Sequence, residues 1–382
     1  MSVNTPPNQQ DSSLETEWIA LLGQRDQPTD GVQDYCQMLS DAFVEYGFSL
    51  ALVRMPWAER GWLSAIRWLW QESITWRGRR VLLQYTALAW SRRGFPIGLL
   101  WVLFLLRYRG AAIAAVFHDP SAYGGTRAID RLRRTVQHFV MRRICVFADH
   151  VVVPVNPAHL FWLTSQQGKV VFVPVGSNIP APLQRPPART QLNERIDVSI
   201  TVFGITPGEA GRRQLRDIQS LVGAAAKCAS RVHVVAVGRG TAEAEPELRQ
   251  LLTASGIYIS VLGLLPAERI GEILAESDVQ IDVRAPISSR RGSSIAGIVC
   301  GTPVIGFESP ETDEAIRGAG VVLAAPGDIG TLTAAITRIL CDDIYCNELR
   351  SRNCAASRNV FSWHAISGQF LRAMHTHSTG KL

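Results

Sequence analysis

The sequence predicts an α/β protein of two Rossmann-like domains, each built on a doubly wound parallel sheet. The chain has 382 residues, which is enough for two domains of about 150–200 residues each. Two series of continuous apolar runs alternate with helix-length segments, a pattern typical of parallel sheets covered on both faces. A proline-rich stretch separates the two series, and proline favours an extended linker over a helix.

Each domain is expected to contain six strands. The first series lies at residues 16–23, 48–55, 79–88, 111–119, 150–155 and 170–176. The second series lies at residues 197–205, 232–238, 257–265, 279–284, 302–308 and 321–326, and the chain beyond residue 329 reads as helical. Open parallel sheets bind ligands at the carboxyl ends of their strands, so we expect a cleft where the two domains face each other.

The domain boundaries follow from this pattern. We expect an N-terminal domain at residues 1–178, a linker at 179–191, a C-terminal domain at 192–361, and a closing helix and tail at 362–382.

Composition favours a cytoplasmic protein. The seven cysteines form no paired framework and no set at zinc spacing, which indicates free thiols in a reducing compartment. The N-terminus is polar, so we expect no signal peptide. The longest apolar run, residues 95–106, is shorter than the ~20 residues needed to span a bilayer and is predicted to be a buried helix.

Charge is distributed unevenly along the chain. Residues 50–150 contain 16 arginines, no lysine and five acids, and nine of the ten tryptophans lie before residue 170. Two segments, 57–80 and 126–143, mix arginine with apolar residues. This composition suits interfacial helices, so peripheral contact with an anionic membrane is a candidate beside ordinary solvated helix faces. No recognition motif supports a nucleic-acid partner.

Two other nucleotide-binding folds are disfavoured. Gly238 and Gly240 follow a strand as in a dinucleotide-binding fingerprint, but Glu243 stands where the third glycine belongs. No phosphate-binding loop of the Walker type occurs either.

The second half of the chain resembles the retaining GT-B glycosyltransferases known as glycosyl transferases group 1. The motifs that carry the resemblance are "VHVVAVGRGTAEAE", "ILAESDVQIDVR", "GSSIAGIVCGTPVIG" and "GAGVVLAAPGDIG", in that order within residues 197–341. The first half matches more loosely, through Gly31, "QYTALAWSRRGFP" and "FHDPSAYGG". The resemblance implies the GT-B fold, in which two such domains face each other.

The implied activity is transfer of a sugar from a nucleoside-diphosphate sugar to a glycan or lipid-linked acceptor. The family's mechanism is retaining and uses no obligate metal or cofactor, since the nucleotide-sugar is a co-substrate. We expect a role in bacterial cell-surface polysaccharide or glycoconjugate synthesis, in the cytoplasm or on the inner face of the membrane. The resemblance leaves the donor, the acceptor and the linkage open.

The chain departs from the family pattern at its two glutamates. Those residues are separated by seven positions, and here Ser288 and Ala296 stand in their place. A subgroup of the fold has Ser-x-Arg-Arg-x-Ser in this loop instead, which "SSRRGSS" matches. The alternative is a catalytically inactive GT-B-like binding or scaffold protein. A GT-B-fold epimerase is disfavoured, because it needs acidic residues around the sugar and this loop has none.

The donor diphosphate is expected to bind the loop and helix that begin near residue 288. Arg290 and Arg291 can bind phosphate oxygens through their planar guanidinium groups. Gly292, Ser293 and Ser294 would open a helix whose N–H groups attract an anion. The plainer interpretation is an ordinary capped helix with two solvated arginines.

Further candidates come from other loops, each with an ordinary structural role as its alternative. Arg212 and Arg213 follow the first strand of the second domain, where relatives hold the diphosphate. In the first domain the resemblance gives His118 a contact with donor or acceptor, and Asp119 is positioned to set its tautomer. Gly31 is expected to let the first loop approach the donor. Ser288 completes the predicted set, which includes no metal ligand.

Overall fold

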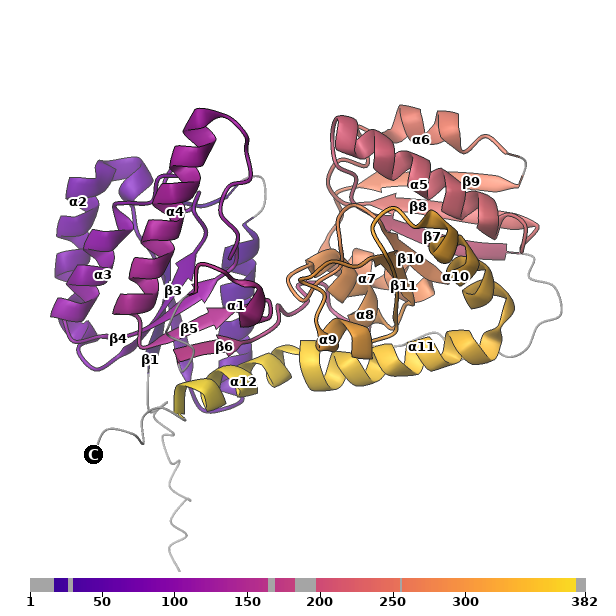
Figure 1. Ribbon diagram of the computed structural model, residues 1–382. Coiled ribbons are helices and arrows are strands. Elements are labelled where there is room, and N and C mark those ends of the chain that lie inside the picture. Colours follow the sequence, from indigo (N-terminus) through magenta and orange to yellow (C-terminus); the bar gives the residue numbers. More distant parts are fainter. Residues whose placement is uncertain (1–16, 27–29, 164–168, 183–196, 255, 376–382) are drawn as a thin grey trace, which may run out of the picture. The chain divides into compact units, whose positions relative to one another are not determined.

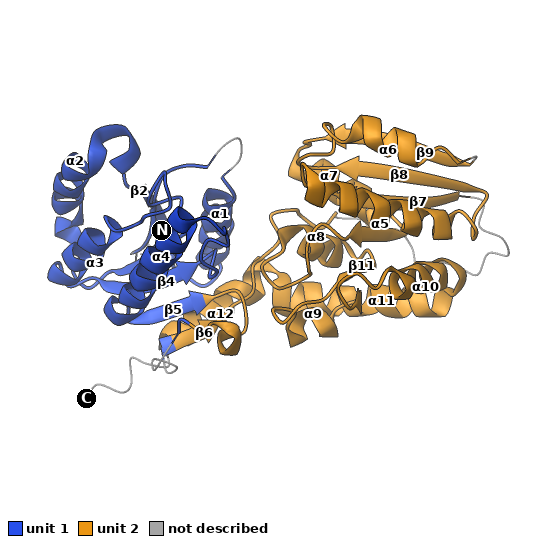
Figure 2. Cartoon of the chain, turned by 45° about the horizontal axis from the view of Figure 1, so that its top comes forward, with its two compact units in different colours: residues 1–152, 162–169 blue, residues 153–161, 170–382 orange. Residues whose placement is uncertain are grey.

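The structure is a computed structural model that describes residues 17–26, 30–163, 169–182, 197–254 and 256–375. The chain divides into two compact units (Figure 2). The first comprises residues 1–152 and 162–169, and the second comprises residues 153–161 and 170–382. The expected linker lies outside the described residues from position 183 onward.

The first sheet has six strands in the order β2-β1-β3-β4-β5-β6. Its strands are β1 (Glu17–Leu22), β2 (Ser49–Arg54), β3 (Arg80–Tyr85), β4 (Ala112–Phe117), β5 (His150–Val153) and β6 (Val170–Phe172). Its helices are α1 (Gly31–Val44), α2 (Trp57–Glu72), α3 (Leu99–Tyr108) and α4 (Ala128–Phe147), with the short 3₁₀ helices η1 (Ser73–Trp76) and η2 (Pro157–His159). The pairs β1–β2, β1–β3, β3–β4 and β4–β5 are parallel.

The connections of this sheet place its helices in two layers (Figure 1). From β1 to β2 the chain moves one way along the sheet, and from β2 through β3, β4 and β5 it moves the other way. Right-handed crossovers therefore put α1 on one face and α2, α3 and α4 on the opposite face. In agreement, α3 packs against both α2 and α4.

The second sheet also has six strands, in the order β12-β11-β10-β7-β8-β9, and its pairs are parallel. Its strands are β7 (Asp197–Phe203), β8 (Arg231–Val237), β9 (Ile257–Gly263), β10 (Val279–Asp282), β11 (Val304–Phe307) and β12 (Val321–Ala324). Its first helices are α5 (Glu209–Ala225), α6 (Glu245–Leu251), α7 (Ala267–Glu276), α8 (Gly292–Cys300) and α9 (Glu314–Gly318). The chain continues through α10 (Ile329–Cys341), α11 (Asp343–Ala356), the π-helical turn η4 (Ser357–Phe361) and α12 (Trp363–His375).

The two cores differ in their side chains. The largest fully buried residues of the first unit are aromatic, among them Trp18, Trp90, Trp162, Phe43 and Phe117. The second core consists mainly of valine, isoleucine and leucine from β7, β8, β10, α5 and α10. β-branched residues suit the crowded faces of a parallel sheet. Both cores hold the strands rigid and so fix the loops at their carboxyl ends.

The predicted fold class is confirmed, since each of the twelve expected strands is present. The helix predicted near residue 293 begins at Gly292, and the chain after Ile329 is helical as far as the structure describes it. The seven cysteines, all within the described residues, are free. In the described part of the chain no helix is long and apolar enough to cross a membrane.

One prediction is wrong. The run at residues 95–106 was predicted to be buried, but Ile97, Trp101 and Phe104 are 52%, 66% and 57% exposed. The opposite side of α3, which includes Leu99, Val102, Leu103 and Leu106, is buried against the sheet. Because this helix is apolar on both sides, hydropathy alone could not show that only one side packs.

Candidate functional site

The strand order of the second sheet reverses between β7 and β10. These two strands are neighbours, but the chain leaves them in opposite directions, towards β8 and towards β11. In open parallel sheets a ligand crevice forms at such a reversal of strand order. The loops after the two strands lie against each other, since a Cβ built on Gly204 would lie 2.8 Å from Nη1 of Arg284.

Three arginines gather in the β10–α8 loop. Burial lowers the pKa of Arg291, and the nearby charges of Arg290 and Arg284 lower it further, whereas Asp282 acts in the opposite sense. Arg290 donates from Nε to Oε2 of Glu311 at 2.9 Å. The cluster therefore concentrates positive charge, and only part of it is matched by carboxylates.

A buried carboxylate supports the start of α8. Asp282, 4% exposed, accepts hydrogen bonds from Ser293 Oγ at 2.8 Å and from Ser294 Oγ at 2.5 Å. Burial raises the pKa of Asp282, and the two serine hydroxyls and the arginines partly offset that effect. Ser293 and Ser294 thus fix the first turn of α8 on the end of β10, and neither hydroxyl is free to act as a primary ligand.

The N-terminus of α8 is open to an anion. Its capping residue, Arg291, makes no side-chain hydrogen bond to the helix, and a Cβ built on Gly292 would meet nothing within 4 Å. The first N–H groups of a helix have no partner within it and carry partial positive charge. An uncapped helix start beside arginines has the features of a phosphate-binding site.

The two positions that hold glutamates in the family pattern are both buried here. Ser288 is 1% exposed and Ala296 is 0% exposed. Among the described residues the Ser288 hydroxyl has no hydrogen-bond partner. A glutamate side chain at either position would need space that these surroundings do not leave. In this conformation Ser288 is not accessible to a ligand, so its predicted role depends on a local rearrangement and stays a prediction.

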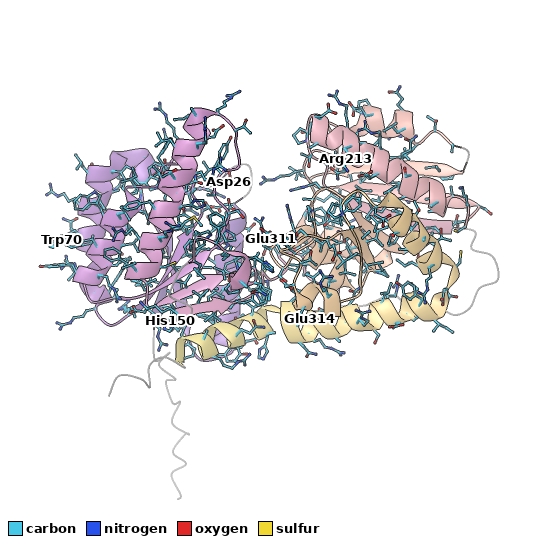
Figure 3. All side chains as sticks on the ribbon, viewed as in Figure 1. Asp26, Trp70, His150, Arg213, Glu311 and Glu314 are labelled. Atoms are coloured by element: carbon cyan, nitrogen blue, oxygen red, sulfur yellow. The ribbon has the colours of Figure 1, made fainter. Side chains whose placement is uncertain are left out.

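The structure gives both arginines at the start of α5 other neighbours than a ligand site. Arg212 pairs with Glu209 of the same helix, and both side chains are exposed. Arg213, labelled in Figure 3, is also exposed, and its guanidinium lies beside Gly327, before α10. Their predicted contact with the diphosphate stays a prediction.

The first unit holds a cavity of about 790 Å³ at the carboxyl edge of its sheet. It is lined by the loops after β1, β3 and β4, by the end of β2, by the start of α1 and by one side of α4. Gly31 and Asp119 line it as well, and a Cβ built on Gly31 would meet nothing within 4 Å. These two predicted residues therefore face open space.

His118 lies just behind this cavity. Its Nε2 is 2.7 Å from Oε1 of Gln84, a residue that lines the cavity, and its ring meets the edge of Tyr35. An amide oxygen only accepts hydrogen bonds, so Nε2 carries the proton and Nδ1 is the basic nitrogen. Burial lowers the pKa of His118 to about 4, against the opposing influence of Asp30. His118 is therefore neutral at ordinary pH.

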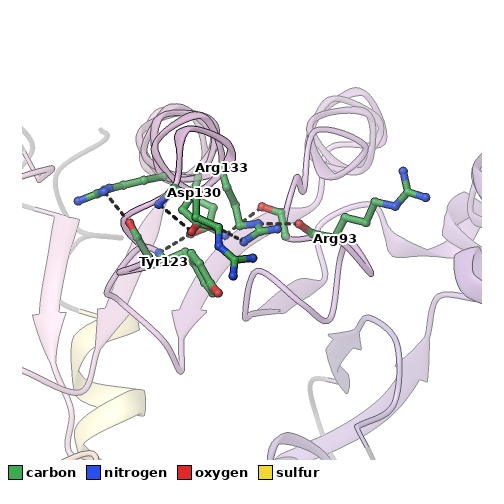
Figure 4. A network of polar contacts seen from close by, with 9 residues as sticks. Arg93, Tyr123, Asp130 and Arg133 are labelled. Carbon is green, nitrogen blue, oxygen red and sulfur yellow. Dashed lines mark hydrogen bonds and ion pairs between the residues drawn. The ribbon is translucent and has the colours of Figure 1, made fainter.

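Two of the five arginines that line this cavity, Arg54 and Arg133, are paired with carboxylates. Arg54 binds Asp30 at 2.9 Å. Arg133 donates to Asp130 and to the carbonyl of Arg93, each at 2.9 Å, and lies over the ring of Tyr123 (Figure 4). These contacts build a rigid polar wall.

Sequence reasoning missed three residues of the second site. Asp282 ends the strand within "VQIDVR", and Arg284 follows it two residues later. A charged residue in a buried strand is costly unless it has a role, so it is itself a signal of function. Glu311 follows the next strand and reaches Arg290 because β10 and β11 are neighbours. Only the sheet order brings those two loops together.

Comparison with known proteins finds a family match within the second half of the chain. Residues 205–342 match the family model of glycosyl transferases group 1. The matched segment runs from the loop after β7 to the end of α10 and contains the arginine cluster. A search of curated proteins finds no matching sequence.

Solved glycosyltransferase structures resemble the whole chain. HepE of Anabaena, in complex with UDP and glucose, has 15% identity and a TM-score of 0.64, covering 94% of this chain and 100% of its own. Sucrose-phosphate synthase of Thermosynechococcus elongatus has 18% identity and a TM-score of 0.65, covering 96% and 100%. A glycosyltransferase of Rickettsia africae has 12% identity and a TM-score of 0.68, covering 96% and 99%. The fold is therefore GT-B.

Proposed function

We propose that this protein is a glycosyltransferase that moves a sugar from a nucleoside-diphosphate sugar to a glycan or lipid-linked acceptor. One observation carries the idea. Three arginines and the uncapped N-terminus of α8 converge at the strand-order reversal of a segment that matches glycosyl transferases group 1. A diphosphate has the charge and size to occupy such a place.

The arginines would act on the leaving group. Negative charge grows on the diphosphate as the glycosidic bond breaks, and preorganised positive groups lower the energy of that transition state. Arg291 is the capping residue of the open helix start, Arg290 and Arg284 act on it by charge, and Glu311 orients Arg290. We place the transfer among retaining, metal-independent reactions, in which the attacking hydroxyl approaches beside the leaving phosphate.

UDP is the first nucleotide to test. HepE of Anabaena is described with UDP, with UDP and glucose, and with UDP-glucose. On the acceptor side we propose the cavity of the first unit, with neutral His118 as an orienting residue or base and Asp119 at the entrance. We further propose a role in bacterial cell-surface glycan synthesis, with peripheral contact at the inner face of the membrane.

A thermal-shift titration tests the donor site. The protein is heated with UDP, GDP, ADP or dTDP, and a nucleotide present at 100 times its Kd should stabilise the folded state by about 2.7 kcal/mol. The Arg291→Ala variant serves as the control and should lose that shift without losing its own stability. If no nucleotide raises the melting temperature of the unsubstituted protein, the donor site is absent.

A binding protein without turnover is the second candidate. The observation that favours it is the burial of Ser288 and Ala296, which leaves the family's two glutamate positions without acidic groups or access. Many active transferases release sugar slowly to water, so UDP release from UDP-glucose separates the two candidates. Nucleotide binding with no release, in the presence of glycan acceptors, would favour the binding protein.

A further inference from the structure

The outer face of the helix layer α2–α3–α4 exposes an apolar stripe on each helix. On α3 the exposed residues are Ile97, Trp101, Phe104 and Tyr108, spaced by four, three and four positions. Such spacing aligns side chains along one side of a helix. The stripe therefore lies opposite the side of α3 that packs on the sheet.

The neighbouring helix α2 repeats the arrangement. Leu63, Trp70 and Ile74 are 91%, 45% and 62% exposed, with exposed Arg67 between the first two. The buried residues Ala65, Leu69, Ser73 and Trp76 lie on the opposite side. Figure 3 shows Trp70 at the outer edge of this unit.

The stripes on α2 and α3 are joined at both ends. Near their starts, a Cβ built on Gly98 would lie 2.4 Å from the ring of Trp62. Near their ends, Trp70 stacks on Tyr108 with ring centres 5.3 Å apart, and Arg109 lies over Trp70 at 4.1 Å. The two helices run parallel, so their exposed stripes form one continuous surface.

The third helix extends the same surface. Leu132, Phe139 and Val146 follow each other at seven-residue intervals on α4 and are 54%, 47% and 51% exposed. Arg143 lies over the ring of Phe139. Because α4 packs beside α3 in the same layer, all three stripes point away from the sheet. We call these ten apolar residues, on and next to α2, α3 and α4, the helix-layer face.

The positive charge of these helices indicates which kind of partner suits the face. The helices α2, α3 and α4 contain eight arginines against three acids, and two of these arginines are paired, Arg107 with Asp149 and Arg133 with Asp130. A second copy of the chain, packed face to face in a two-fold dimer, would set arginine against arginine. An anionic bilayer offers opposite charge over a broad flat area, apolar depth for tryptophan and phenylalanine, and room for arginine to reach the headgroups.

We propose that the helix-layer face binds the surface of an anionic lipid bilayer. It is the surface through which the peripheral membrane contact named under the proposed function takes place, and in that respect it rests on that function. The mode is interfacial. The helices lie along the bilayer with their aromatic rings among the headgroups, and none crosses it.

Co-sedimentation with vesicles tests this surface. The full chain should bind vesicles of equal parts phosphatidylcholine and phosphatidylglycerol, lose most of that binding in high salt, and bind phosphatidylcholine alone weakly. The double variant Trp101→Ser, Phe104→Ser should reduce binding about tenfold or more, because interfacial affinity scales with buried apolar area. Arg67→Glu with Arg142→Glu should reduce binding only to the anionic vesicles.

A matched control comes from the second unit. Tyr258 and Leu264 are 57% and 59% exposed, so Tyr258→Ser with Leu264→Ser removes comparable apolar surface elsewhere. This control should bind vesicles as the unsubstituted protein does, and all variants should keep their melting temperature and UDP-induced shift. Inorganic phosphate should not compete, which separates a lipid surface from a simple anion site.

The outcomes divide clearly. Equal vesicle binding by the Trp101→Ser, Phe104→Ser variant and the unsubstituted chain would overturn the assignment, as would failure of the full chain to bind anionic vesicles. A dimer that this double variant dissociates, without vesicle binding, would make the face a contact between copies. A normal UDP shift in a protein that ignores vesicles would leave the donor site standing and remove only the membrane surface.

Discussion

The two units use arginine in different ways. At the cavity of the first unit, Arg54 and Arg133 are held by Asp30 and Asp130, so their charge mainly stiffens the wall. In the second unit, Arg284, Arg290 and Arg291 lie close together, and one of the two nearby carboxylates is the buried Asp282. Like charges held together destabilise an empty site and favour an anionic ligand. Arg54 and Arg133 therefore support the cavity wall. The crowding of Arg284, Arg290 and Arg291 favours the binding of an anion.

Exposed apolar surface, in contrast, is concentrated in the first unit. Of the nineteen large apolar residues exposed in the described parts of the chain, fourteen lie in the first unit and five in the second. The first unit therefore has the surface suited to a broad partner, and the second has the site suited to a small anion. Four changes would break or sharpen this contrast.

The largest effect is expected from Arg291→Ala. Removing one group that stabilises developing charge typically costs about 2.7–4 kcal/mol, which is a loss of roughly 10²–10³ in kcat/KM. Arg291→Lys should retain more activity than alanine, since it keeps the charge and loses the planar fork. UDP affinity, kcat/KM and melting temperature would be measured together. A large fall in melting temperature without ligand would mean that Arg291 is structural.

The second effect concerns pH and the first unit. The pKa of His118 is about 4 in the folded protein and 6.5 in the unfolded chain, so the unfolded state binds the proton first as pH falls. Above pH 6.5 His118 therefore takes nothing from the free energy of unfolding. Between pH 6.5 and pH 4 its titration lowers that free energy, by at most about 3 kcal/mol. In His118→Asn the fall in melting temperature over this window should be smaller. An identical pH profile in both proteins would contradict the low pKa.

Asp282→Ala should come third. It leaves the hydroxyls of Ser293 and Ser294 without their shared acceptor, at a cost of about 1–3 kcal/mol. The second unit should then unfold at lower temperature. Asp282→Asn is the matched variant, because it keeps an acceptor and removes the negative charge near the helix start. It should bind UDP as tightly as the unsubstituted protein or more tightly, and weaker binding would show that the charge itself is required.

The smallest effect is expected from Glu311→Gln. The ion pair with Arg290 is partly exposed, and such pairs contribute about 0–1 kcal/mol. The melting temperature should change little, whereas UDP affinity should change measurably because Arg290 loses its orienting partner. A stability loss well above 1 kcal/mol, with unchanged affinity, would place the pair in the fold and not in the site.

The sequence predicted the strands well because parallel strands buried on both faces are continuous apolar runs. It predicted the start of α8 for a similar local reason, since Gly292 and the serines follow a loop directly. The arginine partners could not be predicted in this way. Glu311 reaches Arg290 from the loop after a neighbouring strand. Asp282 accepts a hydrogen bond from Ser293 at the start of α8.

Burial was the other limit. The sequence shows that α3 is apolar, but the side on which Trp101 and Phe104 lie becomes known only from the layer in which the helix packs. Likewise Ser288 could be recognised as a substitute for a family glutamate, whereas its burial depends on the packing around the β10–α8 loop. The local pattern of apolar residues predicts a helix or strand. Tertiary packing decides which of its side chains are exposed to a ligand.

The layer formed by α2, α3 and α4 also sets a direction. These helices lie along the sheet, so a bilayer on their outer face would be parallel to the sheet and about one helix diameter, 10–12 Å, away from it. The strands would then run parallel to the membrane plane, and the cavity at their carboxyl edge would open sideways along the membrane. An acceptor could keep its lipid tail in the bilayer and enter that cavity laterally with its polar end, diffusing in two dimensions.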